Sequence, residues 1–156
     1  MAVLEPSIAL RRLRGTPREL VALLATAKTD ALHREQGDGE WSPATVVAHL
    51  ADAELVYGTR IRMVVTADRP YLAGFDENAW VRRFAELETD AKESLARWRT
   101  LRDANLRVLA SLDPDEWKLT GMHAERGEMT VTQIADLLVQ HDHAHLAQIR
   151  AGLADE

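Results

Sequence analysis

Three of the six histidines lie within five residues, at His141, His143 and His145. Successive residues of an α-helix turn by about 100°, so His141 and His145 project about 40° apart, one turn from each other on the same face. Both lie on an apolar stripe that runs from Ile134 to Ile149. Two imidazoles at this spacing are able to share one metal ion, whereas His143 is predicted to point about 200° away, toward solvent or a partner subunit.

The pair formed by His141 and His145 also has a simpler interpretation. Histidines in a helical core can be held by hydrogen bonds to the backbone or to other side chains, without a metal. The spacing leaves both interpretations open. A catalytic metal site usually has three protein ligands and one open position, so a third ligand has to come from another helix. His49, at the edge of an earlier apolar stripe, is the best-placed candidate.

Two carboxylates follow His49 and could support it. Asp52 lies three residues later and about 60° around the helix, which suits a hydrogen bond that orients a ligand imidazole. Glu54 lies within about 40° of Leu50 on the apolar face, where it could hold a ligand histidine, accept a proton or pair with an arginine. His123 falls in an irregular segment and could line the mouth of the site.

Composition and missing motifs exclude several classes of protein. The absence of cysteine excludes disulfides, thiolate metal sites, iron–sulfur clusters and a cysteine nucleophile. No Glu-x-x-His pair, zinc-protease helix, Gly-x-Ser-x-Gly turn or phosphate-binding glycine loop is present, although a Ser-His-Asp triad stays open. The net charge of −6 gives no general attraction to nucleic acid. Without a signal peptide or a long apolar run, we expect a cytoplasmic protein without a membrane segment.

Helical spacing and helix start signals predict four long helices in this chain. The start signals are Thr16-Pro17-Arg18-Glu19, Ser42-Pro43, Thr89-Asp90 and Thr130-Val131-Thr132-Gln133. We expect the first helix to continue through Ala31, a short helix after Asp76, and irregular connections over 68–78 and 117–128. The prediction is one all-α domain over residues 1–156: an antiparallel four-helix bundle with a long connection between helices two and three. That connection could be a crossover along the bundle rather than a hairpin.

Four stretches of the sequence resemble the DinB-like superfamily, which includes YfiT-type metal-dependent hydrolases and certain bacterial thiol transferases. They are Trp41-Ser42-Pro43 and the segments 49–54, 127–131 and 141–149, within a resemblance that extends from about residue 16 to residue 152. The resemblance implies a four-helix bundle and a homodimer. It also implies one divalent metal ion, zinc or nickel, held by His49, His141 and His145.

The resemblance leads to two hypotheses about function. The first is a metal-dependent enzyme in which the ion activates water or a low-molecular-weight thiol, giving a hydrolase or a thiol S-transferase that acts on a small molecule. The second is a non-enzymatic helical dimer with a structural or stress-response role. Since histidine binds metal in its neutral form and its ordinary pKa is about 6.5, metal affinity is predicted to fall below about pH 6.

Overall fold

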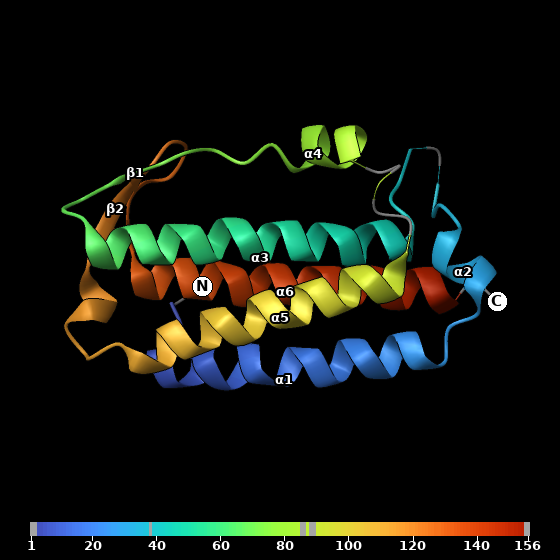
Figure 1. The fold of residues 1–156 in the computed structure, drawn as a ribbon, viewed down its shortest axis with the longest axis horizontal. Helices are drawn as coiled ribbons and strands as arrows, with labels where there is room; N and C mark the ends of the chain where they lie inside the picture. The colour runs from blue at the N-terminus through green and yellow to red at the C-terminus, as the bar shows by residue number, and fades with distance from the viewer. Residues whose placement is uncertain (1–2, 38, 85–86, 88–89, 155–156) are drawn as a thin grey trace.

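The computed structural model describes residues 3–37, 39–84, 87 and 90–154. In this part of the chain, four long helices form a bundle (Figure 1): α1 (Pro6–Ala25), α3 (Pro43–Thr66), α5 (Ala91–Ser111) and α6 (Val131–Ala154). Shorter helices are α2 (Thr29–His33), α4 (Glu77–Phe84) and the 3-10 turn η2 (Glu116–Lys118). The predicted four-helix bundle is confirmed, and α3 packs on both α5 and α6.

The connection between α3 and α5 is a crossover rather than a hairpin. Figure 1 shows α3 and α5 running in the same direction, because the segment after α3 returns along the outside of that helix before α5 begins. The short helix α4 lies on this returning segment, beside α3, as expected for a helix after Asp76. This path gives α3 a neighbour outside the bundle, and that neighbour contributes to the site described below.

A small three-stranded sheet was not expected in an all-α chain. It contains β1 (Tyr71–Leu72), β2 (Thr120–His123) and β3 (Gly127–Thr130), with β1 parallel to β2 and β2 antiparallel to β3. The two segments predicted to be irregular meet at the same end of the bundle, where their backbones satisfy each other's hydrogen bonds. Gly127, with a φ of 73°, allows the tight return between β2 and β3.

The first helix differs from the prediction at both ends. It begins at Pro6 rather than at the capping box, ends at Ala25, and is followed by the separate helix α2. Thr16 lies inside α1, where its hydroxyl donates to the carbonyl oxygen of Arg12. Pro17 is therefore an interior proline, and buried neighbours on either side, Leu13 and Leu20, keep the helix packed through it.

The other start signals behave as predicted. The Ser42 hydroxyl accepts from the Thr45 amide at the start of α3, and the Asp90 carboxylate accepts from the Lys92 and Glu93 amides at the start of α5. Thr89 lies outside the described residues. In the last capping box, the Thr130 amide donates to the Gln133 side chain, and the Gln133 amide donates to the Thr130 hydroxyl.

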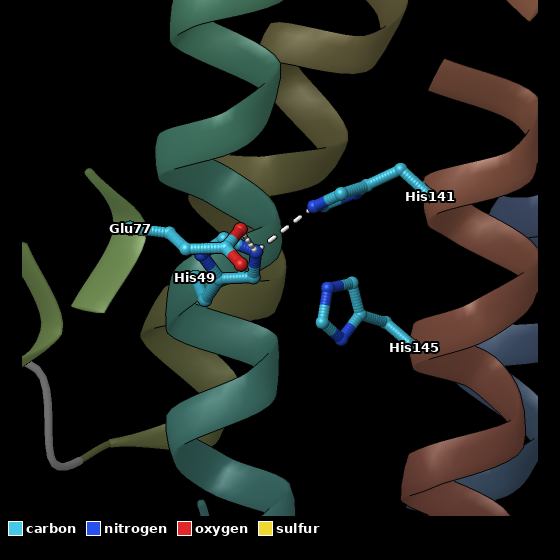
Figure 2. A group of neighbouring side chains, drawn as sticks. All are labelled: His49, Glu77, His141 and His145. Carbon is cyan, nitrogen blue, oxygen red and sulfur yellow. Dashed lines mark hydrogen bonds and ion pairs between the residues drawn. The ribbon is translucent and has the colours of Figure 1, made fainter. Parts of the chain in front are cut away.

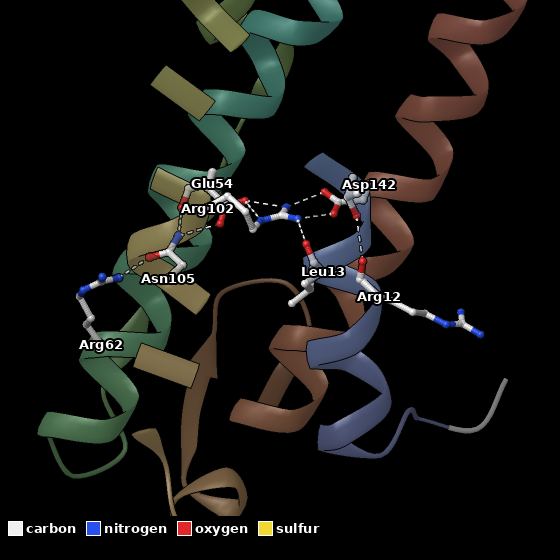
Figure 3. A network of polar contacts seen from close by, with 8 residues as sticks. Arg12, Leu13, Glu54, Arg62, Arg102, Asn105 and Asp142 are labelled. Carbon is white, nitrogen blue, oxygen red and sulfur yellow. Dashed lines mark hydrogen bonds and ion pairs between the residues drawn. The ribbon is translucent and has the colours of Figure 1, made fainter. Parts of the chain in front are cut away.

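The core of the bundle contains a fully buried ionic cluster, which we call the Arg102 cluster: Arg102, Glu54, Asp142 and Asn105 (Figure 3). The guanidinium group donates two hydrogen bonds to Glu54 and two to Asp142, each 2.8–2.9 Å long. Asn105 donates to the second oxygen of Glu54. Burial opposes the charge of Arg102, but the two carboxylates outweigh burial and raise its pKa.

None of the helices in the described part of the chain combines the length and the apolar character needed to cross a membrane.

Candidate metal centre

Three histidines and one glutamate converge between α3, α6 and α4 (Figure 2). The potential ligand atoms of His49, Glu77, His141 and His145 all lie within 4.8 Å of one another. The Nε2 atom of His49 is 2.9 Å from Nε2 of His141 and 3.4 Å from a carboxylate oxygen of Glu77. The structure thus brings together the three histidines singled out in the sequence and adds a carboxylate from the crossover.

The positions of the histidine rings follow from the helices that carry them. His141 and His145 are one turn apart on α6, and both face α3, which carries His49 (Figure 2). The His49 ring lies against Trp41, with ring centres 4.8 Å apart, and is stacked with Phe75 at 6.1 Å. Trp41 lies just before α3 and Phe75 just before α4, so the residues that precede these two helices restrict the orientation of the His49 ring.

A hydrogen bond sets the tautomer of His145. The Gln148 amide oxygen lies 2.9 Å from Nδ1 of His145. Since a carbonyl oxygen only accepts, Nδ1 must carry the proton, and the lone pair on Nε2 is left free for a metal. Ligand histidines usually have such a partner on the second ring nitrogen. The Nδ1 atom of His141 is buried and has no hydrogen-bond partner among the described residues.

The environment keeps two of the imidazoles neutral. Burial, followed by the neighbouring His145, lowers the pKa of His49 from 6.5 to about 3. Burial, followed by His145 and His49, lowers the pKa of His141 to about 2. A metal binds only the unprotonated imidazole, so burial maintains the form that binds.

The spacing and chemistry of the four side chains fit a divalent ion. Metal–nitrogen and metal–oxygen bonds of about 2.0–2.1 Å place tetrahedral ligand atoms about 3.4 Å apart. The separations of 2.9 and 3.4 Å, within a cluster 4.8 Å across, bracket that value. Imidazole nitrogens with one carboxylate suit zinc, nickel and similar ions. The Nε2 atoms of His49 and His141 lie 2.9 Å apart, so without an ion one of them must carry a proton and donate it to the other. A bound ion would instead accept the lone pairs of both atoms.

The remaining residues singled out in the sequence take different places. Glu54 belongs to the Arg102 cluster, so its carboxylate pairs with an arginine and does not line the metal centre. Asp52 is half-buried on α3 and is not one of the four converging residues, and its orienting role stays a prediction. His123 is 6% exposed on β2 and lines a cavity beside His141. His143 faces away from the cluster and is exposed.

Sequence reasoning missed Glu77 and Gln148. Glu77 begins the short helix α4, but no local pattern indicates that this helix lies beside His49. Gln148 was visible on the same stripe as His145, and its spacing of three residues is that of neighbours on a helix face. The spacing therefore could have identified Gln148, whereas Glu77 required the path of the crossover.

A cavity of about 430 Å³ opens beside the metal centre. Its wall includes His141 and Glu77 from the cluster, together with Tyr57, Arg60 and His123. The other lining residues are Phe75, Asp76, Asn78, Glu125, Arg126 and Leu137. A volume of this size accommodates a small organic molecule with one end against the potential metal ligands.

Comparison with known proteins gives a consistent result. The model of a family described as the DinB superfamily matches residues 12–149. The Bacillus subtilis protein named "Putative metal-dependent hydrolase YfiT" is 28% identical over 133 residues, covering 85% of this chain and 73% of its own. The Oceanobacillus iheyensis protein named "Putative metal-dependent hydrolase OB0782" is 23% identical over 140 residues, covering 90% of this chain and 81% of its own.

Two solved structures share the fold. The structure of YfiT from Bacillus subtilis, described as "a probable metal-dependent hydrolase with an unusual four-helix bundle topology", superposes with a TM-score of 0.86. It is 24% identical and covers 96% of this chain and 86% of its own. The four-helix bundle protein TT2238 superposes with a TM-score of 0.67 at 26% identity, over 94% of this chain and 99% of its own.

Proposed function

The chain belongs to the DinB superfamily, and from this premise we propose that it is a metal-dependent enzyme whose divalent ion is held by His49, His141 and His145. The observation that carries the proposal is the convergence of these imidazoles with Glu77 at the wall of a cavity. When bound, the ion lowers the pKa of a water or thiol ligand and so supplies a nucleophile near neutral pH. The relatives named as metal-dependent hydrolases favour water as that ligand.

The four side chains have separate tasks in this proposal. The imidazoles come from the bundle helices α3 and α6 and would hold the ion. Glu77 comes from the short helix α4, and its side chain is 45% exposed, so it is the member of the cluster closest to solvent. Its carboxylate would either bind the ion beside the imidazoles or accept a proton from the nucleophile. A thiol transferase remains the finer alternative, with the thiol supplied by a cosubstrate because the chain contains no cysteine.

A structural role for the ion is the second candidate, and the fold favours the enzyme. The bundle has two apolar core clusters and the Arg102 cluster, all formed by the chain itself. The fold therefore has its own sources of stability, unlike the small domains that unfold without their metal. We expect chelation to remove the ion and leave the helical circular dichroism signal of the bundle nearly unchanged at 25 °C.

The experiment compares metal content and reactivity in three proteins. Wild type is purified with zinc or nickel and analysed for bound metal, then assayed for ester and amide hydrolysis and for conjugation of low-molecular-weight thiols with electrophiles. His141→Ala is expected to lose most of the metal and the activity. His143→Ala, which changes an exposed histidine of the same helix, is expected to keep both. Full metal occupancy in folded His141→Ala rejects the proposed site.

A further inference from the structure

The cavity beside the metal centre contains an unusual buried arginine. Arg60 on α3 is only 7% exposed, and its guanidinium group donates a 2.6 Å hydrogen bond to the carbonyl oxygen of Ala73 and lies 5.6 Å from the centre of the Tyr57 ring. Among the described residues, no carboxylate lies within ion-pair distance of it. Burial lowers the pKa of Arg60 from its ordinary value, which shows the cost of holding the charge there.

Arg102 shows how this protein treats an arginine whose task is structural. Arg102 is buried more deeply, at 1% exposure, and its guanidinium is paired with two carboxylates and a backbone carbonyl. Arg60 has one carbonyl and one aromatic ring, so several of its five N–H donors are left for another acceptor. Because Arg60 lines the cavity, that acceptor would have to be a molecule bound in the cavity.

Two further donors on the same wall lack partners among the described residues. The backbone amide of Glu125 donates to Nδ1 of His123, at 3.2 Å, so the neutral ring carries its proton on Nε2. Burial, followed by the nearby Arg60, lowers the pKa of His123 and favours this neutral donor form. Tyr57 also lines the cavity, and its hydroxyl has no hydrogen-bond partner in the described structure. Three donors therefore surround one part of the cavity.

None of the acidic side chains of the cavity accepts a hydrogen bond from these donors in the described structure, although the charge of Glu125 acts to raise the pKa of both Arg60 and His123. Asp76 accepts the Ala79 amide at the start of α4, and Glu77 belongs to the potential metal ligands. Glu125 is exposed in the turn between β2 and β3, where the exposed Arg126 follows it. The end of the cavity near Arg60 is consequently rich in donors and short of acceptors.

We propose that this end of the cavity binds an anionic group, a carboxylate or a phosphate, through Arg60, Tyr57 and His123. As far as this group belongs to the substrate of the metal centre, the inference rests on the proposed function. Charge-assisted hydrogen bonds from a guanidinium to such oxygens are among the strongest in proteins, and a site screened from water strengthens them further.

The position of Arg60 also indicates the shape of the substrate. Arg60 follows His49 by eleven residues, which is three turns or about 16 Å along the same face of α3. Because helical side chains lean toward the N-terminus of their helix, the guanidinium is closer to His49 than the backbone is. The Tyr57 ring lies between the two groups, 5.9 Å from the His141 ring and 5.6 Å from the guanidinium carbon of Arg60. The substrate class is therefore a small molecule with an anionic group at one end and the reacting bond at the other.

The test uses the metal-free full chain, so that its result does not depend on metal binding or catalysis. Isothermal titration with sodium phosphate and, in a parallel arm, with sodium acetate is carried out at constant ionic strength set with chloride. Wild type is expected to bind at least one of the two with a dissociation constant in the millimolar range. The tighter of the two arms identifies the anion class.

Variants then assign the binding to Arg60. Arg60→Met is expected to weaken the affinity for the better anion at least tenfold, and Arg60→Lys, which keeps the charge without the planar fork, at least threefold. Arg107→Met removes a charge from an exposed arginine on α5 and is expected to match wild type. If Arg60→Met does not fold, the anion affinity of Arg60→Lys tests the proposal. Unchanged affinity in the folded Arg60 variant, or no binding of either anion to wild type, overturns the proposal, whatever the outcome for the metal.

Discussion

The guanidinium group of Arg102 donates a 3.1 Å hydrogen bond to the carbonyl oxygen of Leu13, inside α1. In a regular helix that oxygen would accept from the amide four residues later, but this residue is Pro17, whose nitrogen carries no hydrogen. Arg102 thus supplies the hydrogen bond that Pro17 cannot. Through Leu13, Glu54 and Asp142, the one side chain joins α5 to the other three long helices (Figure 3).

Arg102→Met is expected to destabilise the protein by about 3–5 kcal/mol, because it leaves two buried carboxylates without a counter-charge. The measurement is denaturant unfolding of the metal-free protein, followed by circular dichroism. Combining Arg102→Met with Glu54→Gln and Asp142→Asn is expected to recover part of the loss, since the amides carry no charge. A loss below about 1 kcal/mol for Arg102→Met alone contradicts the role given to the cluster.

Glu77→Gln is expected to weaken metal binding on the order of tenfold, because an amide replaces a carboxylate that lies 3.4 Å from Nε2 of His49. The bundle is expected to keep its stability, since Glu77 lies on the crossover helix α4. Competitive titration with a metal chelator measures the affinity. Glu125→Gln is the matched control, as an exposed glutamate of the same cavity. Equal affinities in the two variants would remove Glu77 from the ligand set.

Gln148→Ala is expected to weaken metal binding about 10–100-fold, because His145 loses the acceptor that holds its proton on Nδ1. Gln140→Ala provides the control in the same helix, where the exposed glutamine donates its amide to Asp136 and, among the described residues, makes no side-chain hydrogen bond to a histidine. Chelator competition on both variants and wild type gives the comparison. If Gln140→Ala weakens binding as much as Gln148→Ala, the effect belongs to the helix rather than to the His145 hydrogen bond.

The stability of the metal-free protein is expected to fall as the pH decreases from about 6. The pKa values of His49 and His141 are lowered to about 3 and about 2 by folding, so below the ordinary value of 6.5 the unfolded chain takes up protons that the folded chain does not. Each such histidine reduces the free energy of unfolding by about 1.4 kcal/mol per pH unit.

The pH experiment measures denaturant unfolding at several values between 6 and 4. His141→Gln lacks one of the two protonating groups, and its stability is expected to fall less steeply than that of wild type, by about 1.4 kcal/mol per pH unit. His143→Gln removes an exposed histidine from the same helix and serves as the reference variant. Parallel curves for wild type and His141→Gln would show that His141 is not held neutral by the fold.

The homodimer implied by family resemblance stays a prediction. Leu55 and Met63 on α3 are 48% and 37% exposed, which leaves apolar side chains on the outer face of a bundle helix. Multi-angle light scattering at micromolar concentration is expected to give twice the chain mass of 17.4 kDa. A mass of one chain at that concentration contradicts the prediction.

Local patterns determined the helices and half of the site. The caps at Ser42, Asp90 and Thr130 act within a few residues, and the four-residue spacing places His141 and His145 on one face before any tertiary contact forms. The first helix was predicted with the wrong bounds, because Pro17 resembles a helix start. The helix continues through Pro17 because Arg102, which is distant in sequence, donates to the Leu13 carbonyl oxygen in place of the missing Pro17 amide.

Tertiary structure alone decided which residues from other helices lie beside the histidines. The crossover between α3 and α5 brings Glu77 to His49, and only the packed bundle pairs Glu54 with Arg102 rather than with a histidine. Ordinary histidine chemistry predicts competition between protons and metal below about pH 6, but burial lowers the pKa of His49 and His141 far below that value. The spacing of residues along the chain determines which face of a helix a side chain lies on. The burial of that side chain and its charged partners depend on which helices pack together.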